Sequence, residues 1–333
     1  MKTDLTKTLC LVTGGAGFIG SHVVDGLLAK GSRVRIIDNL STGNLSNLET
    51  SLSQIEWIQG DIRDELLVRK AMQGVEYVFH LAANRAVLRS VDDPRENNDV
   101  NITGTLYLLL AARDMGVKRF IFTSSSSVYG DTQKFPSKET DFPNPESPYG
   151  ASKLMGEHYC RLFSSLYGLE TASLRYFNVF GPRQNPESRY SCVIPIFIEA
   201  LVENKHPEVH WDGKQSRDFT YVDNIVHGNL LAMQKPGLKG EVFNIACQEE
   251  LSLLGILAHL EKIMGKKSLP PRFSPKRAGD VRRTLADIGK ARQILSFEPQ
   301  TYFEEGLRKT VDWFVKNNRQ KNTRKKQIHA LCA

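Results

Sequence analysis

The feature that most constrains this chain is a glycine-rich turn close to its N-terminus. Residues 9–20 read LCLVTGGAGFIG, and the apolar residues of the following segment, 21–30, recur at helical spacing. The pattern predicts a strand, a tight turn and a helix. Gly15, Gly17 and Gly20 fit G-x-G-x-x-G, which provides a tight turn, a close backbone approach to a pyrophosphate and close packing of helix on strand. The helix N-terminus would offer free N–H groups and a positive dipole to the phosphates.

The next predicted strand, residues 34–38, indicates what the turn binds. Glycine-rich turns also occur as plain connectors, so the turn alone does not establish a nucleotide site. The strand ends in Asp38, at the place where a carboxylate can accept hydrogen bonds from the two ribose hydroxyls of a dinucleotide. A carboxylate would repel a 2′-phosphate. The sequence therefore favours NAD over NADP.

Length and composition indicate an ordinary soluble globular protein. The chain has 333 residues, 41% hydrophobic and 24% charged, enough for one large domain and a smaller one. It has no apolar run of membrane-spanning length and no signal-peptide core at its N-terminus, so we expect a cytoplasmic protein that does not enter a membrane. The five cysteines form no close pair, which predicts free thiols and no metal site.

The net charge of +7 is concentrated at the C-terminus. Six basic residues lie within 316–326, and the rest of the chain is nearly neutral. This distribution argues against a nucleic-acid-binding surface on the body of the protein. We expect residues 316–333 to form a disordered, solvated tail.

Strands and helices alternate along the first half of the chain. Further strands are predicted at 55–62, 75–83, 118–124 and 170–176, with helices at 94–115 and 149–167. This alternation predicts an α/β fold with a Rossmann-type, doubly wound parallel sheet. The alternation lapses after residue 177. We expect an NAD-binding domain over 1–177 and a smaller, mainly substrate-binding α/β domain over 178–315, with some segments returning to the first domain and helices at 193–202, 252–264 and 301–316.

Polar and small residues follow the predicted strands, where doubly wound sheets bind ligands. The loop 39–43 could lie beside the adenosine end of a cofactor, and the small residues 82–83 would let a cofactor lie against the backbone. Asp61 could meet the adenine amino group, or it could instead cap the helix that starts near Asp64.

Tyr149 and Lys153 are spaced four residues apart, so they share one face of a predicted helix. Such a pair is also common as simple packing at the start of a helix. As a catalytic pair, the Lys153 ammonium beside a positively charged nicotinamide would lower the pKa of Tyr149 and make it a usable base. Ser124 or Ser125, at the end of the preceding strand, could hydrogen-bond the substrate oxygen being oxidised.

Taken together, these motifs resemble the extended short-chain dehydrogenase/reductase family, specifically its nucleotide-sugar epimerases and dehydratases. The resemblance runs from TGGAGFIG (13–20) through HLAA (80–83) and YGASK (149–153) to RYFNVFGP (175–182), RDFTYVD (217–223) and RAGD (277–280). It implies cofactor contacts at Gly14, Gly17, Phe18, Ile19, Gly20, Asp38, Asn39, Ser41, Thr42, Gly43, Asp61, Ile62, Leu81, Ala82, Ala83, Tyr149, Lys153 and Tyr176.

The residues after the fifth strand distinguish reactions within this family. Dehydratases carry an Asp-Glu pair there, and the decarboxylase that makes UDP-xylose carries a glutamate, whereas this chain reads TSSSSVYG (123–130). Elimination of water needs an acid and a base besides the tyrosine. The serines therefore favour 4-epimerisation through a 4-keto sugar, with Tyr149, Lys153 and Ser125 as the catalytic residues and NAD kept bound between the two half-reactions.

The resemblance also implies a UDP-sugar substrate and the residues that hold it. These are Arg85, Ser125, Ser126, Asn178, Val193, Arg217, Arg277, Asp280 and Thr284. Thr284 stands where a bulky residue would exclude N-acetylated sugars, which favours UDP-GlcNAc and UDP-GalNAc over strict UDP-Glc and UDP-Gal use. Cys192 stands where many glucose/galactose epimerases have asparagine.

Alternatives remain at this stage. A UDP-glucuronate 4-epimerase, or another member that forms a 4-keto sugar, would carry a similar serine run. A non-catalytic protein that binds NAD or a sugar nucleotide is disfavoured by the intact Tyr149 and Lys153. We further expect a homodimer formed through the helices at 94–115 and 149–167.

Overall fold

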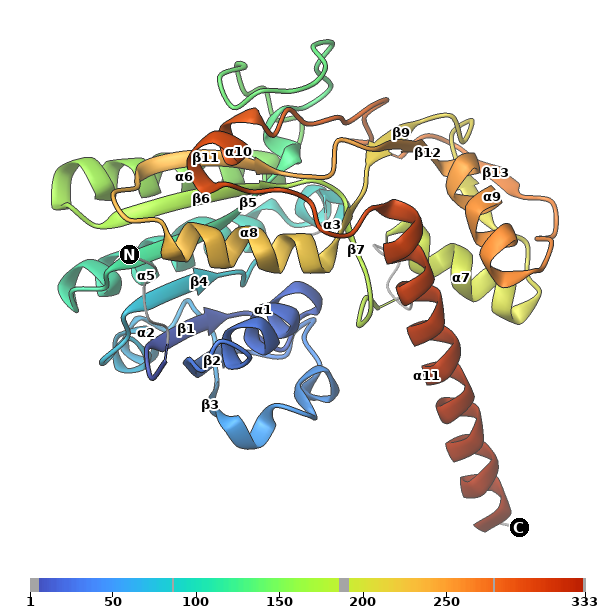
Figure 1. Ribbon diagram of the computed structural model, residues 1–333, viewed down its shortest axis with the longest axis horizontal. Helices are drawn as coiled ribbons and strands as arrows, with labels where there is room; N and C mark the ends of the chain where they lie inside the picture. Colours follow the sequence, from blue (N-terminus) through green and yellow to red (C-terminus); the bar gives the residue numbers. More distant parts are fainter. Residues whose placement is uncertain (1–5, 86, 186–191, 278, 332–333) are drawn as a thin grey trace.

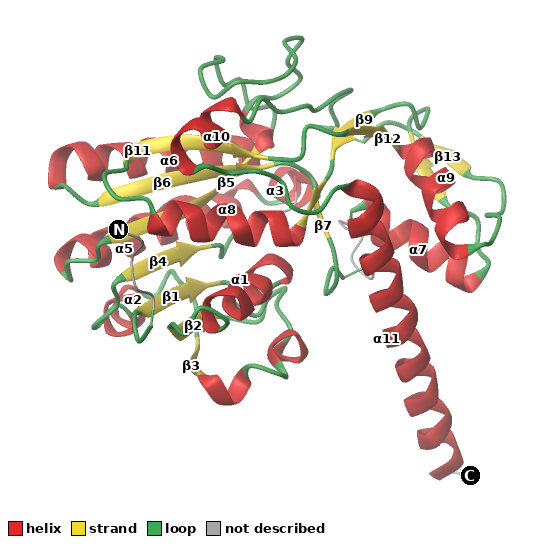
Figure 2. Ribbon diagram, viewed as in Figure 1, coloured by secondary structure: helices red, strands yellow, loops and turns green. Residues whose placement is uncertain are grey.

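The computed structural model describes residues 6–85, 87–185, 192–277 and 279–331 and is built around one parallel sheet (Figures 1 and 2). Its seven strands lie in the order β3-β2-β1-β4-β5-β6-β11, and every neighbouring pair is parallel. The bounds are β1 (Leu9–Thr13), β2 (Arg33–Asp38), β3 (Ile55–Gln59), β4 (Tyr77–His80), β5 (Arg119–Ser125), β6 (Glu170–Tyr176) and β11 (Lys239–Ile245). This order confirms the predicted doubly wound sheet.

Helices cover both faces of the sheet, which explains why its strands are nearly continuous apolar runs. On one face α1, α8 and α10 bury a core that includes Val23, Ile225 and Leu295. On the other face α2, α5 and α6 bury a core that includes Val68, Leu108 and Phe163. The bounds are α1 (Phe18–Leu28), α2 (Glu65–Ala71), α5 (Gly104–Asp114), α6 (Pro148–Tyr167), α8 (Val222–Gln234) and α10 (Gly289–Leu295).

The single helix predicted over 94–115 is three consecutive segments. They are α4 (Pro94–Asn98), a π-helical segment (Asp99–Thr103) and α5, and they follow the short helix α3 (Val87–Asp92). Asp93 caps α4 by accepting a hydrogen bond from the Glu96 N–H at 2.9 Å. In the π-helical segment the side chain of Asn101 is buried and donates to the Asn84 carbonyl and to the Ser152 hydroxyl.

A third core lies at one end of the sheet and joins the C-terminal helices to short strands. Phe18, Phe180, Phe197 and Phe303 are among the residues buried in it. Its elements are β7 (Val179–Phe180), α7 (Val193–Glu203), β8 (Glu208–His210), β9 (Ser216–Asp218), β10 (Thr220–Tyr221), β12 (Glu250–Ser252), α9 (Leu253–Met264), β13 (Arg272–Ser274) and α11 (Phe303–Leu331). The short strands pair as β7 with β10, β9 with β12 and β8 with β13.

Two parts of the fold add to or differ from the sequence expectation. Some segments after residue 177 were expected to return to the first domain without being named; α8 packs against α1 and β11 extends the main sheet beside β6, so the alternation does not end at residue 177. Residues 316–331, expected to be disordered, continue α11 as a helix that projects away from the body (Figure 1). No glycine or proline follows Gly306, and lysine, arginine and glutamine are good helix formers, so nothing in the sequence terminates this helix.

None of the helices described is both long enough and apolar enough to span a membrane. Four of the cysteines, Cys10, Cys160, Cys192 and Cys247, are free thiols. The fifth, Cys332, lies outside the described residues.

Candidate functional site

The glycine-rich turn joins β1 to α1 at the carboxyl end of the sheet. Gly14 has φ of +72°, and a Cβ there would lie 2.8 Å from the Ala82 nitrogen, so Gly14 makes the tight turn. A Cβ on Gly15 would instead meet the Ile36 side chain at 2.7 Å, and one on Gly20 would collide with the Gly14 carbonyl. A Cβ on Gly17 would meet only the Gly14 oxygen, at 3.1 Å. The turn role expected of Gly15 therefore belongs to Gly14, and Gly17 leaves the space beside the helix N-terminus open.

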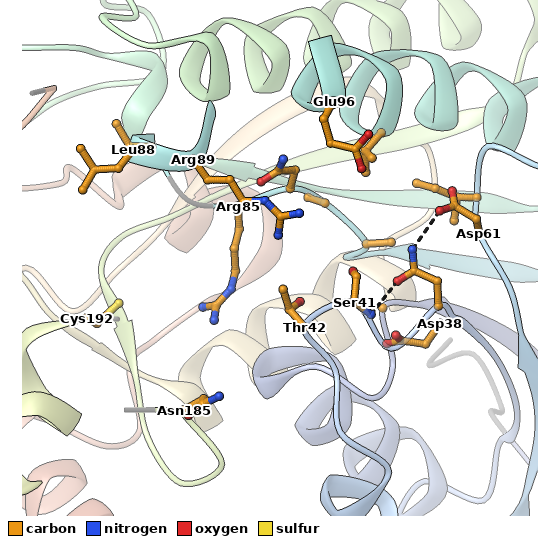
Figure 3. Close-up of a pocket in the computed structure, with 18 of the residues that line it drawn as sticks. Asp38, Ser41, Thr42, Asp61, Arg85, Leu88, Arg89, Glu96, Asn185 and Cys192 are labelled. Atoms are coloured by element: carbon orange, nitrogen blue, oxygen red, sulfur yellow. Dashed lines mark hydrogen bonds between the residues drawn. The ribbon is translucent and has the colours of Figure 1, made fainter. Parts of the chain in front are cut away.

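A cavity of about 760 Å³ opens beside this turn (Figure 3). It lies beyond the carboxyl ends of β1, β2 and β4, where doubly wound sheets bind nucleotides. Most of the polar cofactor contacts expected from the sequence line it, namely Asp38, Asn39, Ser41, Thr42 and Asp61, together with Gly14, Ile62, Ala82 and Ala83. The expected substrate residues Arg85, Arg277 and Asp280 line it too.

Asp38 has the surroundings expected of a carboxylate that binds ribose. Its two oxygens accept hydrogen bonds from the Ala16 N–H at 2.9 Å and the Leu40 N–H at 2.8 Å, which fix the carboxylate at the cavity wall. Gly43 packs behind it, since a Cβ there would lie 2.9 Å from Asp38 Oδ1. Burial raises the pKa of Asp38 above its ordinary value. The open helix N-terminus for phosphates and this carboxylate for ribose together fit NAD.

Asp61 lies at the far end of the same cavity (Figure 3). It accepts a hydrogen bond from Asn39 Nδ2 at 2.8 Å and forms an ion pair with Arg63. The hydrogen bond from the Arg63 side chain lowers the pKa of Asp61 to about 2. The alternative role of Asp61 as a helix cap is wrong, because Asp64 caps α2 by accepting from the Leu67 N–H at 3.0 Å. Asp61 thus remains an ionised acceptor on the cavity wall.

Tyr149 and Lys153 lie on the first turns of α6. The Lys153 side chain is almost fully buried, with Nζ 5.0 Å from the centre of the Phe122 ring and 5.9 Å from that of Tyr149. Burial lowers the pKa of Lys153 to about 7. Burial also raises the pKa of Tyr149, against a hydrogen bond with Ser125 and the charge of Arg85 that lower it. The protein's own groups therefore do not produce the lowered tyrosine pKa expected from the sequence, which needs the cofactor's positive charge in addition.

The structure distinguishes the two candidate serines. Ser124 is buried and donates its hydroxyl hydrogen bond to Glu157, so it does not face the substrate. Ser125 is partly exposed and lies close enough to Tyr149 to lower the pKa of the tyrosine. Its hydroxyl also donates to Ser127 Oγ at 3.1 Å. Ser126, the next residue, is partly exposed and begins a short 3-10 turn.

A second, smaller cavity of about 190 Å³ adjoins the first and shares Cys192, Arg277 and Asp280 with it. Asn178, Val193 and Arg217 of the expected substrate residues line it. Arg217 forms an ion pair with Asp280 and donates to the Ser216 carbonyl at 2.8 Å. The larger cavity can therefore hold an elongated cofactor, and the smaller cavity can hold part of a nucleotide substrate.

Some expected contacts lie elsewhere. Thr284 lines neither cavity, because its hydroxyl accepts hydrogen bonds from Asn178 Nδ2 at 2.9 Å and from the Asp218 N–H at 3.2 Å. The Tyr176 side chain is buried, with its hydroxyl bonded to Asn229 at 2.7 Å, so it is unavailable to a cofactor. The Phe18 side chain is buried in the third core and the Ile19 side chain is partly buried against it, so neither side chain is a cofactor contact. The Leu81 N–H donates to the Thr13 carbonyl at 3.2 Å.

Sequence reasoning missed several residues of the larger cavity, among them Asn84, Leu88, Arg89, Glu96 and Asn185. The first three directly extend the segment that follows β4, so the strand-end rule that indicated Ala82 could have been carried further. In the smaller cavity, His210 and Gln215 come from the ends of short strands that carry no periodic signal. Within the described part of the chain, no group of three His, Cys, Asp or Glu residues is arranged to hold a metal ion.

Known proteins resemble this chain over nearly its whole length. A model of the NAD dependent epimerase/dehydratase family matches residues 10–246. A putative UDP-glucose 4-epimerase from Methanocaldococcus jannaschii is 40% identical over 316 residues, covering 93% of this chain and all of the relative. A UDP-glucuronate 4-epimerase from Thermodesulfobacterium geofontis is 35% identical over 318 residues, covering 92% of this chain and 96% of the relative.

Solved structures agree. A UDP-N-acetylglucosamine 4-epimerase from Methanobrevibacter ruminantium M1, in complex with UDP-N-acetylmuramic acid, superposes with a TM-score of 0.89 at 39% identity, covering 94% of this chain and 99% of that one. These matches confirm the resemblance that the motifs indicated. The chain belongs to the NAD dependent epimerase/dehydratase family and is an enzyme whose cofactor is NAD.

Proposed function

We propose that this enzyme is a UDP-hexose 4-epimerase that interconverts UDP-GlcNAc and UDP-GalNAc and also accepts UDP-Glc and UDP-Gal. The observation that carries the 4-epimerase proposal is that Ser125 lies close enough to Tyr149 to lower the pKa of the tyrosine, at a strand end that holds serines where dehydratases carry acids. The same sheet carries a cavity suited to NAD. The named relatives and structure neighbours that act as 4-epimerases support it.

In the proposed reaction Tyr149 takes the proton of the sugar 4-hydroxyl. Ser125, which lies close to Tyr149, donates to the oxygen that becomes the C4 carbonyl. NAD, when bound, accepts the hydride from C4 and later returns it. The 4-keto sugar turns its other face before the hydride returns, and Tyr149 then gives the proton back. Tyr149 therefore serves as base in the first half-reaction and as acid in the second.

Lys153 and Arg85 act on Tyr149 electrostatically in this proposal. The charge of Arg85 lowers the pKa of Tyr149, and the buried Lys153 lies on the same helix face one turn away. Because the pKa of Lys153 is about 7, its ammonium and neutral forms both exist near neutral pH, and a lysine in that range can pass a proton. The backbone N–H groups of Phe18, Ile19 and Gly20, at the start of α1, would bind the NAD pyrophosphate.

We propose that the UDP part binds where the two cavities meet. Arg217 and Arg277 offer guanidinium groups there, and a planar guanidinium pairs with two phosphate oxygens. Asp280 holds Arg217 in place through their ion pair. Asn178 is held by Thr284, so in this proposal Thr284 acts on the substrate through Asn178.

A second candidate is UDP-glucuronate 4-epimerisation. The observation that favours it is that Arg85 and Arg89 (Figure 3) line the larger cavity together with Arg277. One guanidinium beyond those used by the pyrophosphate could bind the sugar carboxylate. The two candidates differ in the charge of the sugar that the cavity prefers.

We also propose that the enzyme is a homodimer formed through α5 and α6. These helices are in contact with each other, and α6 exposes several apolar side chains, including Leu166, which is 66% exposed, and Tyr167, which is 51% exposed. Exposed apolar groups on one helix are typical of a subunit interface.

Product analysis with a panel of UDP-sugars, without added NAD, tests the proposal. We expect UDP-GalNAc from UDP-GlcNAc, slower formation of UDP-Gal from UDP-Glc, and no net release of NADH. Turnover of UDP-glucuronate with no UDP-GalNAc formed would instead establish the second candidate. Steady accumulation of free NADH would contradict epimerisation itself.

A further inference from the structure

Three buried polar side chains lie behind the Tyr149–Ser125 pair and outside both cavities. Glu157 lies on α6 one turn after Lys153, Ser124 on β5 directly before Ser125, and Arg175 on β6. Their exposed fractions are 4%, 1% and 3%, respectively. None of the roles proposed so far uses them, although burying two charges is costly.

The Glu157 carboxylate connects the helix to two strands. Ser124 Oγ donates to Glu157 Oε1 at 2.5 Å. Arg175 donates from Nε to Oε1 at 2.8 Å and from Nη2 to Oε2 at 2.7 Å, the two-pronged geometry that makes such pairs strong. Ser124 and Arg175 are register partners in the β5–β6 ladder, so one carboxylate fixes α6 against both strands at the same level.

Arg175 is itself held from the other side. Its guanidinium lies 4.6 Å from the centre of the Tyr129 ring, and the Tyr129 hydroxyl donates to Asn244 Oδ1, on β11, at 2.7 Å. Burial alone would lower the pKa of Arg175, but Glu157 raises it above its ordinary value, so the guanidinium stays charged. The network thus extends from α6 across three strands of the sheet.

This network joins the two elements that carry the catalytic side chains, α6 with Tyr149 and β5 with Ser125. Tyr149, Lys153 and Glu157 recur every four residues along one side of α6, and Ser124 is joined to Ser125 by a single peptide bond. Tyr149 and Ser125 must reach the same sugar oxygen, and a misplacement of about 1 Å in such a site costs about 10²-fold in rate.

We propose that Glu157, acting through Ser124, is a positioning residue that sets the Tyr149–Ser125 geometry, and that Arg175 is the counter-ion that allows this carboxylate to be buried. The inference rests on the catalytic roles given under the proposed function. It assigns no contact with substrate to Glu157, Ser124 or Arg175.

Ser124→Ala and Thr171→Val form a matched test. Ser124→Ala deletes the hydroxyl that joins β5 to Glu157 and leaves the Glu157–Arg175 ion pair in place. Thr171→Val deletes another buried hydroxyl bond between the sheet and α6, from Thr171 Oγ1 to the Cys160 carbonyl at 2.8 Å, near the other end of β6. Both variants lose one buried hydrogen bond, but only the first involves the strand end that carries Ser125.

We expect Ser124→Ala to lower kcat at least tenfold with KM for the UDP-sugar within twofold of wild type. The single-turnover rate of bound NAD reduction, followed by near-ultraviolet absorbance, should fall by the same factor. Thr171→Val should keep both rates within twofold at a comparable loss of Tm. Ser124→Cys, which keeps a weak donor of similar size, should recover part of the rate.

Wild-type rates in Ser124→Ala would overturn the proposal, as would an equal loss of rate in Thr171→Val. If Ser124→Ala does not fold, a rate in Ser124→Cys no lower than that of Thr171→Val would also overturn it. A wild-type enzyme that reduces its bound NAD with a sugar nucleotide but forms no 4-epimer would contradict the proposed function alone, because the single-turnover comparison still measures positioning.

Discussion

The Arg63 side chain bridges Asp61 and Glu96, two residues that line the larger cavity, and its removal should weaken NAD binding. Its guanidinium donates to Asp61 Oδ1 at 2.9 Å and Oδ2 at 2.8 Å, and to Glu96 Oε2 at 2.9 Å. Asp61 and Glu96 both line the cavity, from the β3–α2 loop and from α4. In Arg63→Ala both carboxylates lose this partner, and Asp61 keeps only the hydrogen bonds from Asn39 Nδ2 and the backbone N–H of residue 63, so it is held less firmly at the position expected for adenine.

The magnitude follows from the exposure of the three side chains. They are 37%, 27% and 33% exposed, so solvent screens the ion pairs and each contributes at most about 1 kcal/mol. A loss of about 1 kcal/mol in NAD binding corresponds to about a fivefold higher Kd. We expect Arg63→Ala to raise the NAD Kd about three- to tenfold, to reduce the NAD that remains bound after purification, and to leave kcat at saturating NAD within twofold.

Arg69→Ala provides the control. Arg69 lies on α2, on the same side of the sheet, and makes a similar exposed ion pair with Asp114 at 2.9 Å, but neither residue lines the cavity. Isothermal titration of the NAD-free protein measures both variants. An unchanged NAD Kd in Arg63→Ala, or an equal increase in Arg69→Ala, would refute the argument that the bridge orients Asp61.

Three further predictions concern the catalytic helix. Tyr149→Phe should lower kcat about 10²- to 10⁴-fold, the range for loss of a general acid–base, while NAD still co-purifies; a smaller loss in a UDP-GlcNAc assay would remove Tyr149 from the mechanism. The pKa of Lys153 is lowered from 10.5 to about 7, so the unfolded chain binds more protons than the folded one between these pH values. The free energy of unfolding should therefore rise with pH across this window. Chemical denaturation at pH 7 and pH 10 should show that Lys153→Met loses this pH dependence. Leu166→Asp should convert a dimer to monomers in light scattering, whereas an unchanged mass would place any interface elsewhere.

The sequence alone determined the features that depend on local spacing. The strands at 34–38 and 170–176 and the helix ending at Tyr167 were predicted within a residue or two, because apolar periodicity and turn residues act over short distances. The sequence also identified the family. The family's motifs are ordered along the chain and each is a few residues long, so they can be recognised without knowing which segments meet.

The tertiary structure decided what depends on contacts between distant segments. After residue 177 the sequence lacks a regular alternation, yet β11 pairs with β6 in the main sheet and α8 packs on its face beside α1. Without them the edge of β6 and the apolar face beside α1 would be exposed to solvent. The part of α11 after residue 316 shows the opposite case. Its charge pattern predicted disorder, whereas its many lysine, arginine and glutamine residues extend a helix already anchored by Phe303 and Leu307.

The site itself divides in the same way. Sequence patterns identified Asp38, Tyr149 and the serine run, since each lies at a strand end or a helix start. The strand pattern left Ser124 and Ser125 open, and only the family resemblance selected Ser125. The physical reason for that choice is the bond of Ser124 to Glu157, more than thirty residues away along the chain. Sequence patterns also could not show that Thr284 holds Asn178 from 106 residues away. A side chain's direction is set by the partners that fold against it, and only the assembled structure contains those partners.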